Sequence, residues 1–239
     1  MSYKFDIATI ETSCKNCSLS ELCLPRGLSD DEMHVLDNLV EKRKPYNAGD
    51  YLFQSGQTFK KLYAIKSGSV KVVLPSEDGE QQIIGFFMPG ELLGLDAMGK
   101  KKHVCSAIAL ETTSVCSLPF NEMQDICHDI KSLSKQFLSL ISSEIGNEHQ
   151  MLLTLGKKKA ESRLATFLIN LSSRYSRRGL ASNEFNLTMS RHDISNYLGL
   201  AVETISRLFT RLQEDEILTV NRRLVKIVDH KKLKALAKL

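Results

Sequence analysis

The chain has 239 residues, of which 42% are hydrophobic, enough for two modest domains with real cores or for one domain with appendages. It contains no apolar run of about eighteen residues, the length that a membrane-spanning helix needs, so we expect no membrane span. The net charge of +4 is divided unevenly, because residues 156–239 carry 17 Lys and Arg against 8 Asp and Glu, whereas the rest carries 15 against 20. A basic C-terminal part indicates contact with a polyanion there, with chance variation of the surface as the alternative.

The N-terminal arm contains three cysteines within ten residues. It begins MSYKFDIATIETS, which lacks the basic start and apolar block of an export signal, so we expect a cytoplasmic protein in reducing surroundings. The segment CKNCSLSELC follows, with Cys14, Cys17 and Cys23. In such surroundings clustered cysteines indicate metal binding or redox sensing rather than disulfides. Thiolates suit an iron–sulfur cluster or zinc, and the spacing alone leaves both open, together with unligated buried cysteines.

A short helix and a run of strands come next. Ser29 is a plausible N-cap for SDDEMHVLDNLVEK, with acidic residues in its favourable first turn. From Arg43 to about Phe120 short β runs alternate with glycine-containing turns, which predicts a small β-barrel or sandwich.

Residues 121–158 are predicted to be helical and to carry a regular apolar stripe. The stripe steps by 3, 4, 3, 4 and 3, the a/d spacing of a coiled coil, through Leu138, Ile141, Ile145, Glu148, Leu152 and Leu155. We interpret it as a homodimer interface; the alternative is a helix buried against its own domain. Glu148 at a d position would face its own copy and weaken the pairing, which makes association switchable, unless its side chain turns outward to solvent.

The basic C-terminal segment has the pattern of a winged helix-turn-helix. Ser190 and Asp193 form a capping-box-like start, and Gly199 ends the first short helix as a left-handed residue would. A second helix is predicted from Val202 to about Glu214. A β-hairpin, the wing, and a last basic helix, HKKLKALAKL, complete the segment.

The second helix carries Glu203, Ser206 and Arg207 side by side on its exposed N-terminal face. Arg can bond guanine bidentately, Glu can accept from the cytosine amino group, and Ser can contact a base edge, so this trio suits reading of the major groove. The alternative is a solvated face with a local ion pair between Glu203 and Arg207. The expected phosphate contacts are Arg191, Thr204, Arg211, Arg222 and Arg223.

With these features in place, the chain resembles the CRP/FNR superfamily of bacterial transcription regulators, and within it the oxygen-sensing FNR type. The motifs that carry the resemblance are CKNCSLSELC, LYAIKSGSVKVV, FFMPGELLGLDAMG, LTMSRHDISNYLGL and VETISR. The resemblance implies an α+β protein with a cysteine arm (1–28), a cyclic-nucleotide-binding-like β-roll sensory domain (29–133), a dimerisation helix (134–158) and a C-terminal winged helix-turn-helix (159–239). It implies an oxygen-labile [4Fe–4S] cluster on Cys14, Cys17, Cys23 and Cys116, so that the β-roll supplies the fourth thiolate.

The resemblance also separates this chain from the cyclic-nucleotide branch of the superfamily. Cys105 stands about where that branch has the arginine for the cyclic phosphate, and a thiol cannot form the same bidentate contact. Val202 and Ser206 likewise match the FNR type, whose half-site resembles TTGAT. By that resemblance Arg207 reads the guanine, Glu203 the opposite cytosine and Ser206 a thymine, within an inverted repeat bound by a dimer.

Three further expectations complete the interpretation. The seam acid is aspartate in the best-known member of the type, so Glu148 keeps the charge on a longer side chain. The loop from Ser76 to Glu80 matches a surface that touches RNA polymerase in the family. Cys105 and Cys127 are expected to be small buried hydrophobes.

We expect a regulator of anaerobic genes, acting as activator or repressor, and not an enzyme. Two alternatives stay open. One is a zinc-stabilised or small-molecule-sensing regulator of the CRP type. The other is an iron–sulfur redox protein, although no glycine-rich nucleotide loop, second cluster motif or convergent acid–base set supports it.

Overall fold

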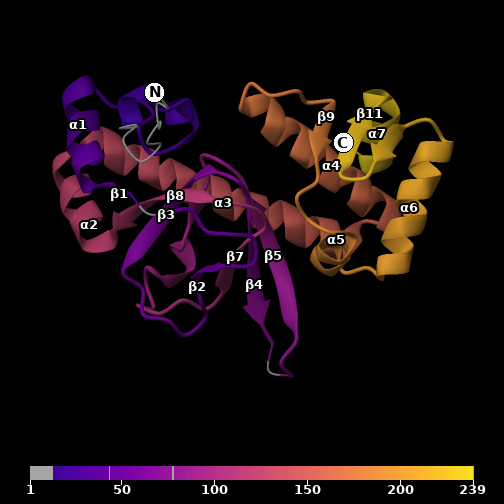
Figure 1. The fold of residues 1–239 in the computed structure, drawn as a ribbon, viewed down its shortest axis with the longest axis horizontal. Helices are drawn as coiled ribbons and strands as arrows, with labels where there is room; N and C mark the ends of the chain where they lie inside the picture. The colour runs from indigo at the N-terminus through magenta and orange to yellow at the C-terminus, as the bar shows by residue number, and fades with distance from the viewer. Residues whose placement is uncertain (1–12, 43, 77, 239) are drawn as a thin grey trace, which may run out of the picture.

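The computed structural model describes residues 13–42, 44–76 and 78–238. The expectations for the first twelve residues, for Arg43 and for Glu77 in the turn from Ser76 to Glu80 fall outside the described residues. The described part of the arm and the helices and strands of residues 30–129 lie toward one end of the molecule, and the helices and small sheet of residues 160–238 lie toward the other (Figure 1). The long helix α3, Lys131–Lys157, runs between the two ends.

The arm folds into two single turns of 3-10 helix, η2 (Cys14–Asn16) and η3 (Ser20–Leu22), before helix α1 (Asp30–Leu39). The predicted N-cap of α1 is confirmed. Ser29 Oγ accepts from the Glu32 amide at 3.3 Å, and the Glu32 carboxylate accepts from the Ser29 amide at 2.8 Å. This reciprocal capping box satisfies two backbone donors at the helix start.

The predicted region of short strands is a β-roll of two four-stranded antiparallel sheets, in the orders β1-β8-β3-β6 and β2-β7-β4-β5. Apolar side chains of both sheets, among them Phe53, Ile65 and Val72, form the core of the roll. A single turn, η4 (Leu95–Ala97), lies between the strands. The strands are β1 (Glu41–Lys42), β2 (Tyr51–Phe53), β3 (Lys61–Ser67), β4 (Val70–Pro75), β5 (Gln81–Phe87), β6 (Leu92–Leu93), β7 (Ser106–Ala109) and β8 (Ser114–Pro119).

The predicted helical region over residues 121–158 consists of two helices. Helix α2 (Phe120–Asp129) ends at Ile130, whose extended backbone (φ −104°, ψ 96°) separates it from α3. The side chain of Ile130 packs with the cluster formed by α1, α2 and the start of α3. Tertiary packing therefore accompanies the break between the two helices, which lies before the predicted stripe from Leu138 to Leu155.

The C-terminal end contains the expected helix-turn-helix and wing. Helix α5 (Arg191–Leu198) ends at Gly199 in the left-handed region (φ 60°), and α6 (Val202–Glu214) follows, as predicted. A three-stranded sheet has the order β10-β11-β9, with β9 (Glu184–Asn186), β10 (Leu218–Asn221) and β11 (Leu224–Ile227). Helices α4 (Ala160–Arg177) and α7 (His230–Ala237) complete it. The sequence reasoning did not identify α4 or β9.

The core of the C-terminal end continues into the β-roll. Phe86 of β5 lies against Phe167 of α4 and Tyr197 of α5, with ring centroids 6.0 and 5.0 Å away. The β-roll and the C-terminal end are therefore packed together. Among the described residues, no helix is both long and apolar enough to cross a membrane.

Candidate metal centre and nucleic-acid interface

The thiols of Cys14, Cys17, Cys23 and Cys116 line one cavity, although Cys116 lies 93 positions beyond Cys23. The first three come from the arm, and Cys116 comes from β8, where it pairs with Ala64 of β3. The remaining lining is largely apolar and includes Leu19, Leu24, Pro25, Leu36, Val40, Ile65 and Leu118. The structure thus brings together the four cysteines that the resemblance selected and leaves Cys105 and Cys127 outside this cavity.

Backbone hydrogen bonds fold the arm around this cavity. The Cys14 amide donates to Asp37 Oδ1 at 2.5 Å, which ties the first cysteine to α1. The carbonyl oxygens of Cys14, Cys17 and Cys23 accept from amides three residues onward at 3.1–3.3 Å. These short turns direct successive thiols toward the same space.

Burial disfavours the thiolate forms of Cys14 and Cys23 in the absence of a cation. It raises the pKa of Cys14 well above its usual range, and hydrogen bonding and the charge of Asp37 add to the effect. Burial likewise raises the pKa of Cys23 to about 12; the Leu24 amide opposes the shift, and Cys116 and Cys17 add to it. Four neighbouring thiolates therefore need positive charge among them, which metal ions supply.

The donor set fits an iron–sulfur cluster. Four thiolates, one for each iron, are the usual ligands of a [4Fe–4S] cluster, and a largely apolar lining keeps water away from it. Within the described ranges, no three His, Cys, Asp or Glu side chains are grouped as ligands of a metal ion. The four cysteines therefore share one cavity without forming a compact, preformed metal site among the described residues.

The arm also contacts the long helix. Gln136 Nε2 donates to the Cys23 carbonyl at 3.1 Å, and Ser132 Oγ donates to Glu32 Oε1 at 2.7 Å. Leu133 between them is fully buried in the cluster that contains Leu24. The first turns of α3 are therefore held both by the cysteine arm, through Cys23, and by α1, through Glu32.

Farther along α3, the predicted seam faces away from its own chain. Leu138 is 62% exposed, Ile145 47% and Leu152 68%, and Glu148 is also exposed. Ile141 and Leu155 are half-buried. An apolar stripe that its own chain leaves open is typical of a surface that another molecule covers.

The recognition helix presents the predicted trio to solvent. Glu203, Ser206 and Arg207 are exposed on α6, while Ile205, Phe209 and Leu212 on the opposite face are buried. Arg207 Nε donates to the Glu203 carbonyl at 3.4 Å, and Ser206 Oγ donates to the Val202 carbonyl at 3.0 Å. Within the part of the chain that the structure describes, no ion pair joins Glu203 to Arg207, so the alternative of a local pair receives no support.

The expected phosphate contacts have different surroundings. Arg222 and Arg223 are exposed at the turn of the wing, where Arg222 has a positive φ of 55°. Arg211 lies near Glu161 and Asp215 at 3.7 and 3.8 Å, and Thr204 is half-buried.

Arg191 takes part in the packing between α5 and α6 and is half-buried. Its guanidinium lies 3.2 Å from the centroid of the Phe209 ring, and burial lowers its pKa to about 10. The side chain thereby fixes the contact between α5 and α6, a role that its sequence position did not indicate.

Inside the β-roll, the surroundings of Cys105 are unlike those of an anion-binding site. This thiol is buried, and the neighbouring Asp96 carboxylate accepts from the amides of Val104 (2.9 Å) and Cys105 (3.4 Å). Burial raises the pKa of Asp96, but hydrogen bonds from His103 and the Val104 amide outweigh it, so the pKa stays below its usual value. A carboxylate in this place disfavours a cyclic phosphate.

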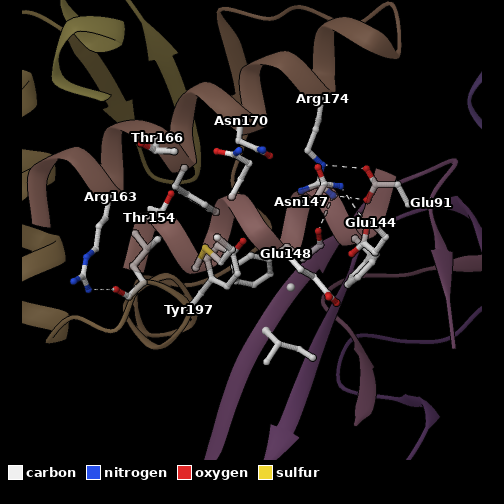
Figure 2. A pocket seen from close by; sticks show the side chains of 18 of the residues that line it. Glu91, Glu144, Asn147, Glu148, Thr154, Arg163, Thr166, Asn170, Arg174 and Tyr197 are labelled. Atoms are coloured by element: carbon white, nitrogen blue, oxygen red, sulfur yellow. Dashed lines mark hydrogen bonds and ion pairs between the residues drawn. The ribbon is translucent and has the colours of Figure 1, made fainter. Parts of the chain in front are cut away.

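Sequence reasoning missed a groove between α3, α4, α5 and β5 (Figure 2). At one end Glu91 pairs with Arg174 and Arg178, joining the β-roll to α4. Burial raises the pKa of Glu144 there, and the charges of Glu91 and Glu148 add to that effect. At the other end lies Arg163, which donates hydrogen bonds to three backbone carbonyls. The residues that line this groove are far apart in the sequence, so no local sequence motif predicts it.

Comparisons with known proteins agree with this architecture. Residues 43–129 match the cyclic nucleotide-binding domain family, and residues 162–236 match the Crp-like helix-turn-helix domain family. The transcriptional activator protein Anr of Pseudomonas protegens is 46% identical over 227 residues, 95% of this chain and 93% of that protein. The fumarate and nitrate reduction regulatory protein of Salmonella typhimurium is 46% identical over 224 residues, 94% and 90% of the two chains.

A solved structure also shares the fold. FixK2 from Bradyrhizobium japonicum superimposes with a TM-score of 0.76 at 26% identity, over 82% of this chain and 96% of that chain.

Proposed function

Because the chain belongs to the CRP/FNR family of transcription regulators, we propose that it is an oxygen-responsive regulator whose four clustered cysteines hold a [4Fe–4S] cluster. It is a DNA-binding transcriptional activator of the FNR/Anr type rather than an enzyme. The observation that carries the proposal is the single cavity lined by Cys14, Cys17, Cys23 and Cys116.

The four thiolates would be the ligands of the cluster, which when bound supplies iron–sulfur bonds that oxygen can break. Cys14, Cys17 and Cys23 give up their protons as ligands, and the apolar side chains around them limit the access of water. Cys116 joins the arm to the β-roll. The arm keeps its fold as long as all four thiolates share the same centre.

The ordered arm then supports the dimer. Gln136 and Ser132 hold the first turns of α3 through the Cys23 carbonyl and Glu32. With α3 held, the exposed stripe from Leu138 to Leu155 pairs with that of a second copy. Glu148 of each copy opposes the pairing by charge repulsion, so the dimer depends on the support from the arm and separates when oxygen releases it.

The dimer places two recognition helices on an inverted repeat. Arg207 reads guanine, Glu203 the opposite cytosine and Ser206 a thymine in each TTGAT-type half-site. The phosphate contacts come from Arg191, Thr204, Arg211, Arg222 and Arg223.

Contact with RNA polymerase involves the hairpin turn between β4 and β5. In this turn Ser76 Oγ donates to Asp78 Oδ1 at 2.7 Å, and the Ser76 amide donates to the Glu80 carbonyl at 2.8 Å. These hydrogen bonds hold Ser76, Asp78 and Glu80 together as polar groups that a protein partner can recognise.

The proposal is tested by operator binding with and without oxygen. Anaerobically prepared protein should bind a TTGAT inverted repeat far more tightly than the same sample after exposure to air. A protein that stays dimeric in air and binds the repeat with unchanged affinity would contradict it. Redox turnover with a partner protein and no operator preference would favour the iron–sulfur redox alternative.

A further inference from the structure

We propose that Arg163 is a positioning residue that sets the angle between the dimer helix and the helix-turn-helix, and thereby the spacing between the two recognition helices. This inference rests on the proposed dimer. It concerns a residue that touches no base and no cysteine.

The connection between α3 and α4 is short, and its two residues continue the hydrogen bonding of the flanking helices. The Lys158 amide donates to the Thr154 carbonyl at 3.1 Å, and the Lys159 carbonyl accepts from the Arg163 amide at 2.9 Å. Helix α3 ends at Lys157 and α4 begins at Ala160. Both residues between them are extended, Lys158 at φ −87° and ψ 145° and Lys159 at φ −70° and ψ 160°. A pair of extended residues between two rigid helices is the usual form of a hinge.

Arg163 spans this hinge with one guanidinium. Its Nη2 donates to the Leu155 carbonyl at 2.8 Å and its Nε donates to the Lys158 carbonyl at 2.9 Å. Both acceptors belong to the last turn of the dimer helix or to the hinge. Free carbonyls at a helix C-terminus favour a cation, so these contacts are both directional and electrostatically favourable.

The third contact reaches the helix-turn-helix. Arg163 Nη1 donates at 3.0 Å to the carbonyl of Leu198, the last residue of α5. The turn follows at Gly199, where an added Cβ would lie 3.6 Å from the same nitrogen. Recognition helix α6 begins at Val202, so this contact lies immediately beside the turn that sets its direction.

The shape of the guanidinium explains why Arg is required here. Its donors form a rigid planar fork, so bonds to three carbonyls from two helix ends and the hinge fix those groups relative to one another. A second side chain also holds the hinge. Lys158 Nζ donates to Thr166 Oγ1 at 2.8 Å and to the Ala237 carbonyl at 2.9 Å. The seam helix and the DNA-reading unit therefore meet at Arg163.

The test compares Arg163→Ala and Arg163→Lys with Arg177→Ala in the full-length, anaerobically prepared protein. Arg177 lies exposed on the same helix and serves as a control for the lost charge. Affinity is measured for the inverted repeat at its native spacing, for repeats with one base pair inserted or removed, and for a single half-site. Thermal unfolding of each variant is recorded in parallel.

We expect Arg163→Ala to bind the native repeat about tenfold more weakly and to lose much of its preference for the native spacing. Its half-site affinity and its dimerisation should match those of the wild type. Arg163→Lys should recover part of the spacing preference, because an ammonium keeps the charge but not the planar fork. Arg177→Ala should behave as the wild type.

Unchanged spacing preference in Arg163→Ala would overturn the inference. So would an equal loss on half-site and full repeat together with a lower unfolding temperature, since Arg163 would then only stabilise the domain. If the wild type itself shows no preference for the repeat over the half-site, both this inference and the proposed dimeric function fail.

Discussion

Asp193 and Lys71 connect the helix-turn-helix to the β-roll through a carboxylate that also caps helix α5. Asp193 Oδ1 accepts from Lys71 Nζ at 2.6 Å, while Oδ2 accepts from the Ser190 amide at 2.9 Å and from Ser190 Oγ at 2.6 Å. The Asp193 side chain is 11% exposed and that of Lys71 24%. One charge therefore serves both the start of the helix-turn-helix and its attachment to the β-roll.

The first prediction concerns this carboxylate. Asp193→Asn should lower the free energy of unfolding by about 1–2 kcal/mol, because it removes a charged cap and one side of a largely buried pair. Urea unfolding measures the change. Lys71→Met, which keeps the cap, should cost less than Asp193→Asn; an equal or larger cost would show that the cap contributes little.

The same carboxylate predicts a dependence on pH. Burial raises the pKa of Asp193, but hydrogen bonds from Lys71 and Ser190 outweigh it and hold the pKa below its usual value. A lowered folded-state pKa stabilises the fold fully above the unfolded value of about 3.9, and this contribution is lost as the pH falls through the folded value. Stability should therefore fall less steeply with acid in Asp193→Asn than in the wild type. If the free energy of unfolding fell equally steeply with decreasing pH in the two proteins, this prediction would be wrong.

A third prediction tests the seam. Glu148→Gln removes the repelling charge with little change of shape, and we expect it to strengthen the dimer roughly tenfold and to leave more dimer after exposure to air. Sedimentation at a series of concentrations gives the association constant. His149→Ala, an exposed neighbour outside the a/d stripe, is the matched control. A Glu148→Gln protein that associates no better than the wild type would place this carboxylate in solvent, outside the dimer interface.

A fourth prediction separates the cysteines. Cys116→Ser should bind little iron after anaerobic reconstitution, because one of the four thiolates is lost. Cys127→Ser should bind as much iron as the wild type, since Cys127 does not line the shared cavity. Iron and sulfide analysis gives the result. Full iron content in Cys116→Ser together with loss in Cys127→Ser would reassign the fourth ligand.

A fifth prediction divides base reading from phosphate contact. Arg207→Ala should cost about 1–3 kcal/mol of binding and relax the preference at the guanine of each half-site. Arg222→Ala should weaken binding to all sequences alike and reduce the slope of log affinity against log salt by about one for each site occupied. Competition binding with single-base variants distinguishes the two; a uniform loss in Arg207→Ala would remove its assigned role.

The features that were predictable from sequence are those set by neighbours along the chain. The N-cap at Ser29, the capping box at Ser190 and the left-handed stop at Gly199 depend on residues close together in the sequence, and each is present. The strands of the β-roll follow from short apolar runs with glycine turns.

The remaining features depend on tertiary contacts, which produce no periodic pattern in the sequence. The break at Ile130 accompanies packing between α1, α2 and α3, and the pair of Lys71 with Asp193 joins residues 122 positions apart. Arg163 lies in an ordinary helical pattern, and only the fold reveals that three backbone carbonyls surround it. Cys116 was found by resemblance, because nothing in the spacing of the arm points to β8.

The most direct measurement follows the visible absorption of anaerobically purified protein while air is admitted, with particle size recorded by light scattering in the same sample. We predict a brown protein that loses its colour while dimers become monomers, which would tie the cavity of Cys14, Cys17, Cys23 and Cys116 to the seam on α3. A colourless protein that contains zinc, or one whose size does not respond to air, would contradict the assignment of an oxygen sensor to the cysteine arm.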